Sequence, residues 1–396
     1  MASDRSQPFD EAALLAEARQ KAGLMEFGDE GFRTPLRVLL ASLANARLNT
    51  VGTTVLRTSI RHSLTQRLLG EDWLVRHPEI ADERIRGPIV VVGMMRSGTT
   101  LIQRLLSRDP RFYCAFGWEI AEPAPRPGTS WNHPDPRITD GEVRARRMRD
   151  FAPELHAIHP SEALEADEEI VFLADAFLSH IPEASCDVPA YRSWIDSQDF
   201  APAYRYLRRM LAFLQWQKRQ RGEHRERWVL KTPAHLGYLD TLFSVFPDAR
   251  VVHMHRSPLE TIPSGASLNH TLWKMYADEV DPVEVGRQWL ERMAWSTRRS
   301  LAVRDRMPDA AERFVDVWYR DAVSDPLAQV ERIYDAVGME LISEARSAME
   351  RWLAEDTRDG RPAHRYSAEQ FGLSAVRIRE VFAEYMARFI DPRESD

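Results

Sequence analysis

One short segment restricts the fold of this chain more than any other. Residues 88–100 read PIVVVGMMRSGTT, so a β-branched run ends at Gly93, and an apolar helical pattern begins near Thr99. A buried parallel strand, a glycine-containing turn and a helix N-terminus together form a phosphate-binding loop. Gly98 permits close backbone approach, and the amides of the first helical turn present positive charge to an anion. The segment predicts an α/β protein that binds a phosphorylated ligand.

The loop differs from those that bind ATP. Gly93 and Gly98 have the separation found in a Walker A loop, and Thr100 has its terminal hydroxyl position. Thr99, however, stands where a kinase has the lysine that reaches the β- and γ-phosphates, and Arg96 precedes the second glycine. No strand ending in a Walker B aspartate is evident. A P-loop kinase using ATP and Mg²⁺ is therefore the alternative function, and this loop argues against it.

The rest of the chain alternates strand and helix patterns, which predicts a central, mostly parallel β-sheet flanked by helices. Helical spacing from Asp10 to about Ile80 predicts an N-terminal helical extension, residues 1–86, packed on a core domain, residues 87–396. A Pro- and Gly-rich stretch, residues 122–137, predicts a long surface loop. The further strands expected are Trp228–Leu230, Arg250–His255 and Arg313–Trp318, followed by helices at Leu236–Phe246, Leu259–Leu268 and Ala322–Val337.

Composition and charge argue against several classes of protein. A net charge of −7 over 396 residues argues against a nucleic-acid partner, because such proteins neutralise phosphates with net basic domains. Two cysteines, Cys114 and Cys186, are too few for a disulfide framework and suit a reducing compartment. The polar N-terminus lacks a signal-peptide core, and no apolar run approaches the ~20 residues that cross a bilayer. We expect a soluble cytoplasmic protein without a transmembrane segment.

Two motifs carry a family resemblance. PIVVVGMMRSGTTLIQRLLSRDPRF, from Pro88, resembles the 5′-phosphosulfate-binding region of sulfotransferases, and RSGTTL is shared with the bacterial and tyrosylprotein branches. DARVVHMHRSPLETIPSGASL, residues 248–268, is similar to the 3′-phosphate-binding region, with Arg256 and Ser264 at the family's spacing. The resemblance covers about residues 87–390. It implies the P-loop sulfotransferase fold and transfer of a sulfonyl group from 3′-phosphoadenosine 5′-phosphosulfate (PAPS) to an acceptor hydroxyl or amine, releasing PAP without a metal.

The resemblance also implies the binding residues. Lys231, in RWVLKTPAHL, matches a catalytic lysine, and Arg96 would share with it the charge that develops during transfer. Tyr319 matches an aromatic residue that contacts the adenine, although a half-buried aromatic at the sheet edge is an equal alternative. The full expected cofactor-binding set is Arg96, Ser97, Gly98, Thr99, Thr100, Leu101, Arg256, Ser264 and Tyr319, with Arg361, His364, Arg365 and Tyr366 from the loop GRPAHRYSAEQFGLS.

The acceptor must lose a proton as it attacks, so a base is required. Glu119, in YCAFGWEIAEP, lies near the position where the tyrosylprotein enzymes carry a glutamate, and we predict it as the catalytic base. A two-residue insertion is needed for that alignment. Glu122, His133 and His159 therefore stay open as alternatives.

Other features leave questions about the acceptor and partners. His253 and His255 share one strand face but have no evident third ligand, which favours a hydrogen-bonded pair over a metal site. The N-terminal helices could cover the acceptor site or form a homodimer contact. Aromatic residues that could be core or could line a pocket for a lipid, glycolipid or aryl alcohol are Trp118, Trp131, Phe172, Phe177, Trp273 and Tyr276.

Overall fold

Alternate residues of strand β1 (Ile89–Gly93) point into two different apolar layers. Ile89 and Val91 belong to one buried cluster, while Val90 and Val92 belong to the other. Side chains of a strand alternate between the faces of its sheet, so a strand covered by helices on both faces must be apolar throughout. This explains the unbroken run of β-branched residues.

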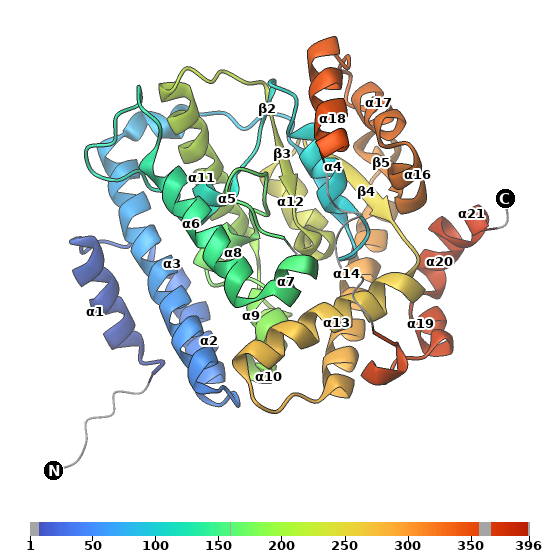
Figure 1. Ribbon diagram of the computed structural model, residues 1–396, viewed down its shortest axis with the longest axis horizontal. Coiled ribbons are helices and arrows are strands. Elements are labelled where there is room, and N and C mark those ends of the chain that lie inside the picture. The colour runs from blue at the N-terminus through green and yellow to red at the C-terminus, as the bar shows by residue number, and fades with distance from the viewer. Residues whose placement is uncertain (1–7, 159, 356–365, 395–396) are drawn as a thin grey trace.

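The computed structural model describes residues 8–158, 160–355 and 366–394, and β1 lies at the centre of its sheet. The strand order is β2-β3-β1-β4-β5, and every pair is parallel. Helices cover both faces of this sheet (Figure 1). The predicted α/β fold class is confirmed. The other strands are β2 (Phe112–Tyr113), β3 (Arg227–Lys231), β4 (Arg250–His255) and β5 (Phe314–Trp318).

Many helices surround the sheet, and they account for most of the described chain. The α-helices are α1 (Glu11–Ala22), α2 (Arg33–Ala44), α3 (Thr50–Arg76), α4 (Thr99–Leu106), α5 (Gly117–Ala121), α6 (Pro136–Phe151), α7 (Pro153–Ile158), α8 (Ile170–Asp175), α9 (Ile181–Ser185), α10 (Pro189–Ile195), α11 (Ala201–Gln220), α12 (Leu239–Val245), α13 (Pro258–Tyr276), α14 (Pro282–Arg306), α15 (Ala310–Arg313), α16 (Tyr319–Ser324), α17 (Pro326–Ala336), α18 (Ser343–Glu355), α19 (Ala375–Val381), α20 (Ala383–Phe389) and α21 (Asp391–Glu394). Short 3-10 helices are η1 (Glu30–Phe32), η2 (Pro78–Asp82), η3 (Pro233–Tyr238) and η5 (Glu369–Phe371). None of those described has both the length and the apolarity of a bilayer-spanning helix.

Helices α1–α3 form the N-terminal extension. Leu14, Leu36 and Leu64 are fully buried in the same apolar cluster as Val90 of the central strand. Helix α3 packs against α8 and α13, and the extension lies along one side of the molecule (Figure 1). The division into two domains at residue 86 stays a prediction.

Some helix and strand boundaries differ from those predicted from the sequence. The helix expected over Ala322–Val337 is two helices, because Pro326 starts α17 and Asp325 caps it by accepting from the Ala328 amide at 3.0 Å. Helix α13 continues past Leu268 to Tyr276, since its buried face extends to Trp273. Strand β2 was not predicted; it has only two residues, too few for a periodic pattern.

Candidate active site

The phosphate loop joins β1 to α4 with a tightly folded backbone. Arg96 and Gly98 have φ angles of 74° and 90°, in the left-handed region. A Cβ atom at Gly98 would lie 2.8 Å from the ring of Tyr319, and one at Gly93 would lie 2.6 Å from the Met254 carbonyl oxygen. Both glycines are therefore required by close approach of neighbouring groups. The left-handed Arg96 is a non-glycine outlier of the kind that clusters at functional sites.

Ser97 lies inside this loop and is fully buried. Its amide donates to the Met94 carbonyl oxygen at 3.1 Å, but its hydroxyl has no hydrogen-bond partner among the described residues. A buried hydroxyl without a partner costs about 1–3 kcal/mol, which a bound oxyanion would offset. The loop, with Thr99 and Thr100 at the start of α4, has the features of an anion-binding helix N-terminus.

Lys231 reaches this loop from the carboxyl end of β3. Its Nζ atom donates to Thr100 Oγ1 at 3.2 Å and to Glu168 Oε1 at 2.6 Å. Its backbone amide donates to Glu169 Oε2 at 3.0 Å, and Glu169 Oε1 lies 2.7 Å from His235 Nε2. Glu169 and His235 are buried, so this pair fixes the strand end from which Lys231 projects.

Arg256 and Ser264 meet Arg96 beside the loop. Arg96 Nε donates to Ser264 Oγ at 3.2 Å, and Arg256 Nη1 donates to the Arg96 carbonyl oxygen at 2.9 Å. The guanidinium of Arg256 lies 3.9 Å from the ring centre of Tyr319, and it also pairs with Glu260 at 2.6 Å. Residues 160 or more apart in the sequence thus form one basic, hydroxyl-bearing surface.

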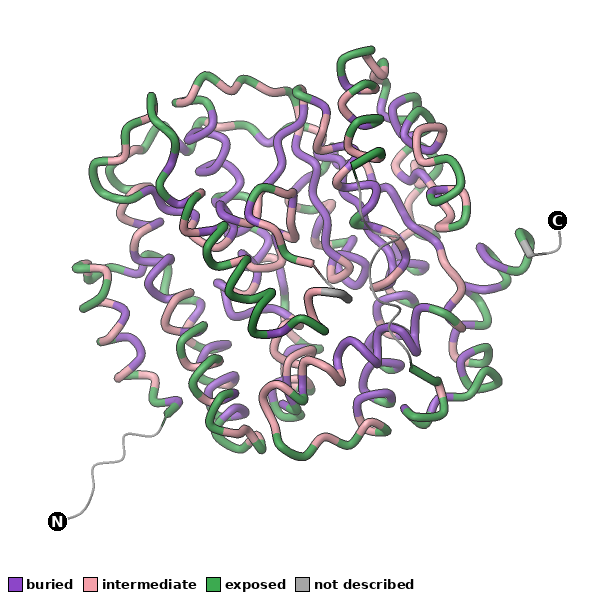
Figure 2. Tube along the Cα trace, in the orientation of Figure 1, coloured by how far each residue is buried: buried purple, intermediate pink, exposed green. Residues whose placement is uncertain are grey.

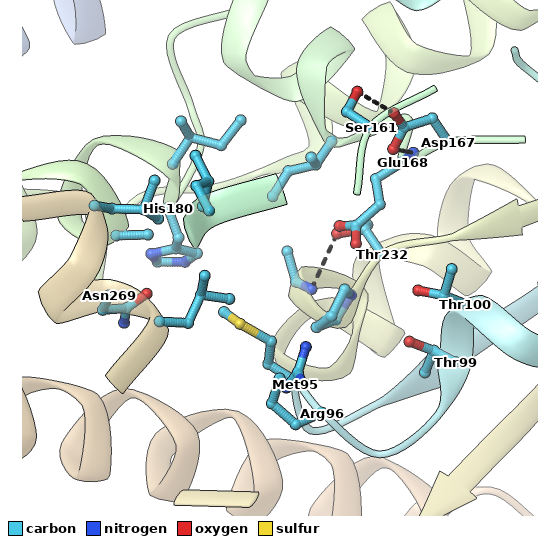
Figure 3. Close-up of a pocket in the computed structure, with 18 of the residues that line it drawn as sticks. Met95, Arg96, Thr99, Thr100, Ser161, Asp167, Glu168, His180, Thr232 and Asn269 are labelled. Carbon is cyan, nitrogen blue, oxygen red and sulfur yellow. Dashed lines mark hydrogen bonds between the residues drawn. The ribbon is translucent and has the colours of Figure 1, made fainter. Parts of the chain in front are cut away.

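A cavity of about 710 Å³ opens from the phosphate loop. Its polar end is lined by Arg96, Thr99, Thr100, Glu168 and Arg256. Figure 3 shows Thr99 and Thr100 on one side, Met95 and Arg96 between, and His180 and Asn269 on the opposite side. The remaining wall comes from helices α5, α6, α7, α8, α9, α13 and α14 and is mainly apolar, with residues such as Ile120, Leu155, Val171, Leu272, Trp273 and Met293.

Glu119 does not face this cavity. Its Oε2 accepts from the Phe116 amide at 2.9 Å and its Oε1 pairs with Lys218 Nζ at 2.6 Å, with both side chains about 4% exposed. The carboxylate caps α5 and compensates a buried ammonium. This geometry corrects our assignment of Glu119 as the base, because a group with both oxygens committed away from the cavity cannot meet an acceptor.

The alternative bases also lie elsewhere. Glu122 pairs with Arg126 and Arg144, and His133 is exposed on the loop before α6; neither lines the cavity. His159 lies outside the described residues. So do Arg361, His364 and Arg365, while Tyr366 is described and exposed.

Sequence reasoning missed Glu168, the carboxylate that lies next to Lys231. The sequence offered one signal, because three consecutive acids, Asp167-Glu168-Glu169, stand directly before an apolar helical pattern. In the structure one of them, Glu169, is almost fully buried, which is rare for a carboxylate without a partner. Of the aromatic residues expected near an acceptor, Trp273 lines the cavity, whereas Trp118, Trp131, Phe172, Phe177 and Tyr276 do not.

The two histidines of β4 form a hydrogen-bonded network with β5. His255 Nε2 lies 2.8 Å from Asp316 Oδ1, and Asp316 also accepts from Arg304 at 2.7 Å. Arg304 Nη1 lies 3.2 Å from His253 Nδ1. Although His253, His255 and Asp316 have the residue types of a metal set, the guanidinium among them supplies the positive charge that a cation would supply. These contacts favour the hydrogen-bonded pair.

The parallel sheet, with a glycine-containing loop between its central strand and α4, is the architecture of proteins with a phosphate-binding loop. A model of the sulfotransferase family matches residues 88–344, and the chain belongs to that family. The chain is similar to the omega-hydroxy-beta-dihydromenaquinone-9 sulfotransferase Stf3 of Mycobacterium tuberculosis and of Mycobacterium bovis, with 26% identity over 260 residues. That match spans 64% of this chain and 63% of those relatives.

Two solved structures have the same fold. Sulfotransferase STF1 from Mycobacterium tuberculosis H37Rv is 30% identical, with a TM-score of 0.84 over 96% of this chain and 100% of that chain. Sulfotransferase STF9 from Mycobacterium avium is 26% identical, with a TM-score of 0.87 over 98% of each chain. Their coverage includes the N-terminal helices, which our motifs had left without a counterpart.

Proposed function

We propose that this protein transfers the sulfonyl group of PAPS to a hydroxyl or amine of an apolar acceptor and releases PAP. The observation that supports the proposal is that two groups of basic and hydroxyl-bearing side chains meet at one end of a cavity whose other walls are mainly apolar, and that Lys231 contacts Thr100 and Glu168 at this end. A donor with two separate phosphate groups fits the first feature. An acceptor that is mostly hydrocarbon fits the second.

The residues present suit such a donor. The loop amides, the unpartnered Ser97 hydroxyl and the start of α4 would hold its 5′-phosphosulfate. Arg256 and Ser264 would hold its 3′-phosphate, since a guanidinium and a hydroxyl suit a phosphate dianion. Tyr319 lies between these groups, against Arg256 and the Gly98 turn, and an adenine ring could stack there.

The chemical step moves a trigonal sulfonyl group from a phosphate oxygen to the acceptor oxygen, so negative charge grows on the leaving phosphate. Lys231 and Arg96 can stabilise that charge, and Lys231 can donate to the leaving oxygen. Glu168 is our proposed base. It lines the cavity, its carboxylate lies 2.6 Å from Lys231 Nζ, and it is the carboxylate best placed to accept the acceptor's proton.

For the acceptor, we propose a lipid or another apolar alcohol. The Stf3 relatives are named for action on an omega-hydroxylated dihydromenaquinone, which is itself an apolar alcohol. The cavity of about 710 Å³ is large enough to hold a nucleotide and part of a hydrocarbon chain. Cys114 and Cys186 are both free and buried, which fits the cytoplasmic location that we propose.

The test is thermal stabilisation by PAP compared with ADP and ATP, first without and then with Mg²⁺. Saturation at about 100 times Kd adds roughly 2.7 kcal/mol. An unfolding entropy of about 2.1 cal/mol/K per residue over 396 residues converts this to a shift of about 3 °C. We expect this shift with PAP alone, and its loss in Arg256→Ala.

A matched control is Arg377→Ala. It removes the ion pair of Arg377 with Glu380, as Arg256→Ala removes that of Arg256 with Glu260, but Arg377 does not line the cavity. It should keep the full PAP shift. A shift that requires ATP and Mg²⁺ would instead establish the kinase alternative and refute the sulfotransferase proposal.

A further inference from the structure

A chain of buried polar side chains lies next to the residues that form the polar end of the cavity. Tyr204 of α11, Glu169 before α8 and His235 of η3 are 0%, 1% and 0% exposed. None of the three lines the cavity, but Glu168 and Ala234, their neighbours in the sequence, do. These buried groups therefore cannot touch a substrate, and any part they have in the reaction must act through other residues.

The hydrogen bonds of this chain have a defined direction. The Tyr204 hydroxyl lies 2.7 Å from His235 Nδ1, and His235 Nε2 lies 2.7 Å from Glu169 Oε1. The Lys231 backbone amide donates to Glu169 Oε2 at 3.0 Å. Because a carboxylate only accepts, His235 Nε2 carries the ring proton, and Nδ1 accepts from the Tyr204 hydroxyl. The chain of bonds thus ends on the backbone of Lys231.

Stability alone does not call for such a chain. Burying a carboxylate, an imidazole and a phenol removes each of them from water, and apolar side chains of similar volume often stabilise a core as well or better. The bonds among Tyr204, His235 and Glu169 instead fix one orientation of the carboxylate, because each of its oxygens has a different donor. That orientation holds one strand end in place.

Glu169 is connected to both groups that we propose for proton transfer. Its carboxylate accepts from the Lys231 amide, and its backbone adjoins Glu168, whose Oε1 lies 2.6 Å from Lys231 Nζ. One residue earlier, the Asp167 carbonyl oxygen accepts from Gln103 Nε2 of α4 at 2.9 Å. The irregular segment that carries Glu168 is therefore tied to α4 on one side and to β3 on the other.

We propose that Glu169 is a positioning residue for sulfonyl transfer: it sets the separation of Lys231 and Glu168, and His235 and Tyr204 hold its carboxylate. The inference rests on the proposed function, which assigns Lys231 to the leaving oxygen and Glu168 to the acceptor's proton. A misplacement of about 1 Å can cost about 100-fold in rate. The chain should therefore affect kcat, while PAP affinity, which we assign to the loop, Arg256 and Ser264, should change little.

The first test compares two substitutions of Glu169 by PAP release from PAPS and by calorimetric binding of PAP. Glu169→Leu removes both acceptor oxygens, so kcat should fall by about 10- to 100-fold, while the Kd for PAP changes by less than about threefold. Glu169→Gln should keep kcat within about threefold, because its oxygen can accept from the Lys231 amide while its NH2 group donates to His235 Nε2. The ring proton then resides on Nδ1 and is donated to the Tyr204 oxygen.

Asp109 offers a matched control. It is a fully buried carboxylate that accepts from the Arg111 amide at 2.8 Å and from the Tyr334 hydroxyl at 2.6 Å, and it does not line the cavity. Asp109→Leu should lower Tm as Glu169→Leu does, but the folded protein should keep its kcat. If the leucine variants fail to fold, Tyr204→Phe should lower kcat, and Tyr334→Phe, which also removes one buried hydroxyl, should not.

A second measurement needs no activity. Because lysine is rare in this chain, labelling at Cε would give well-resolved NMR signals from Lys21, Lys218, Lys231 and Lys274. The two ε protons of Lys231 should have separate chemical shifts in the wild type and in Glu169→Gln, since its ammonium is held in one place, and they should merge in Glu169→Leu. The buried Lys218 is an internal reference whose signals should stay separate in all variants.

Wild-type kcat in Glu169→Leu, or an equal loss of kcat in Asp109→Leu, would overturn the positioning role. So would unchanged Lys231 signals in Glu169→Leu. These outcomes differ from failure of the proposed function. If the protein neither binds PAP nor releases it from PAPS, the sulfotransferase proposal fails, whereas the Lys231 signals, recorded without nucleotide, still show whether Glu169 holds Lys231.

Discussion

Exchanging two glutamates for glutamine should separate catalysis from stability. Glu168 lines the cavity beside Lys231, whereas Glu119 is buried against Lys218 and the Phe116 amide. Glu168→Gln removes the proposed proton acceptor but keeps an oxygen that can accept from Lys231. A positioned general base contributes about 10²–10⁴-fold, so turnover should fall by that factor, and PAP affinity should change by less than about threefold.

Glu119→Gln should have the opposite effects. It leaves the ammonium of the buried Lys218 without its countercharge, and breaking a buried ion pair costs about 3–5 kcal/mol. With an unfolding entropy of about 0.8 kcal/mol/K for a chain of this length, Tm should fall by about 4–6 °C. Turnover of the folded protein should be retained.

The assay is PAP release from PAPS with an acceptor found by screening hydroxylated apolar compounds, alongside thermal unfolding of each variant. Glu168→Gln with wild-type turnover would refute Glu168 as the base. Loss of turnover in Glu119→Gln without destabilisation would return the base to Glu119 and contradict our interpretation of the capping contact.

Two further predictions concern the loop and the buried histidines. Gly98→Ala should weaken PAP binding more than tenfold in calorimetry, because its Cβ would meet the Tyr319 ring at 2.8 Å. The control is Gly23→Ala, at a φ of 68° in open space, which should cost about 1 kcal/mol of stability and leave PAP binding intact. Equal PAP affinity in both variants would contradict the steric argument. Burial, helped by the nearby His255 and Arg304, keeps the pKa of His253 well below its usual value. Below about pH 6.5 this histidine therefore takes up a proton in the unfolded chain but stays neutral in the folded one. The free energy of unfolding should fall there by up to about 1.4 kcal/mol per pH unit. Urea unfolding at about pH 7.5 and about pH 5.5 should show a smaller loss in His253→Gln, and an unchanged loss would exclude this histidine as a cause.

The sequence predicted those parts of the site that depend on strand ends. In a parallel sheet the carboxyl ends of neighbouring strands meet at one edge, so β1, β3 and β4 had to bring Gly93, Lys231 and Arg256 together. The contacts among Arg96, Ser264 and Arg256 are consistent with that expectation, although their role in binding PAPS stays a prediction.

The position of Glu119 could not be predicted in the same way. It lies on the short helix α5, whose orientation depends on a buried partner, Lys218, 99 residues later in the chain. A carboxylate at N3 can cap its own helix or face a cavity, and local sequence does not distinguish the two. Glu168, too, lies in an irregular segment, where no periodicity indicates the direction of a side chain.

The two ends of the cavity differ in how easily substitutions could alter their shape. The end where we propose that the donor binds is positioned by hydrogen-bonded strands, whereas the proposed acceptor end is made by α5, α6, α7, α8, α9, α13 and α14, which pack on the core. Helix α6 is the most exposed of these (Figure 2). We expect substitutions there to alter acceptor choice without disturbing the proposed nucleotide site. Helix α13 is the exception, because Ser264 and Asn269 lie on it only five residues apart, and a displacement of this helix would affect donor and acceptor binding together.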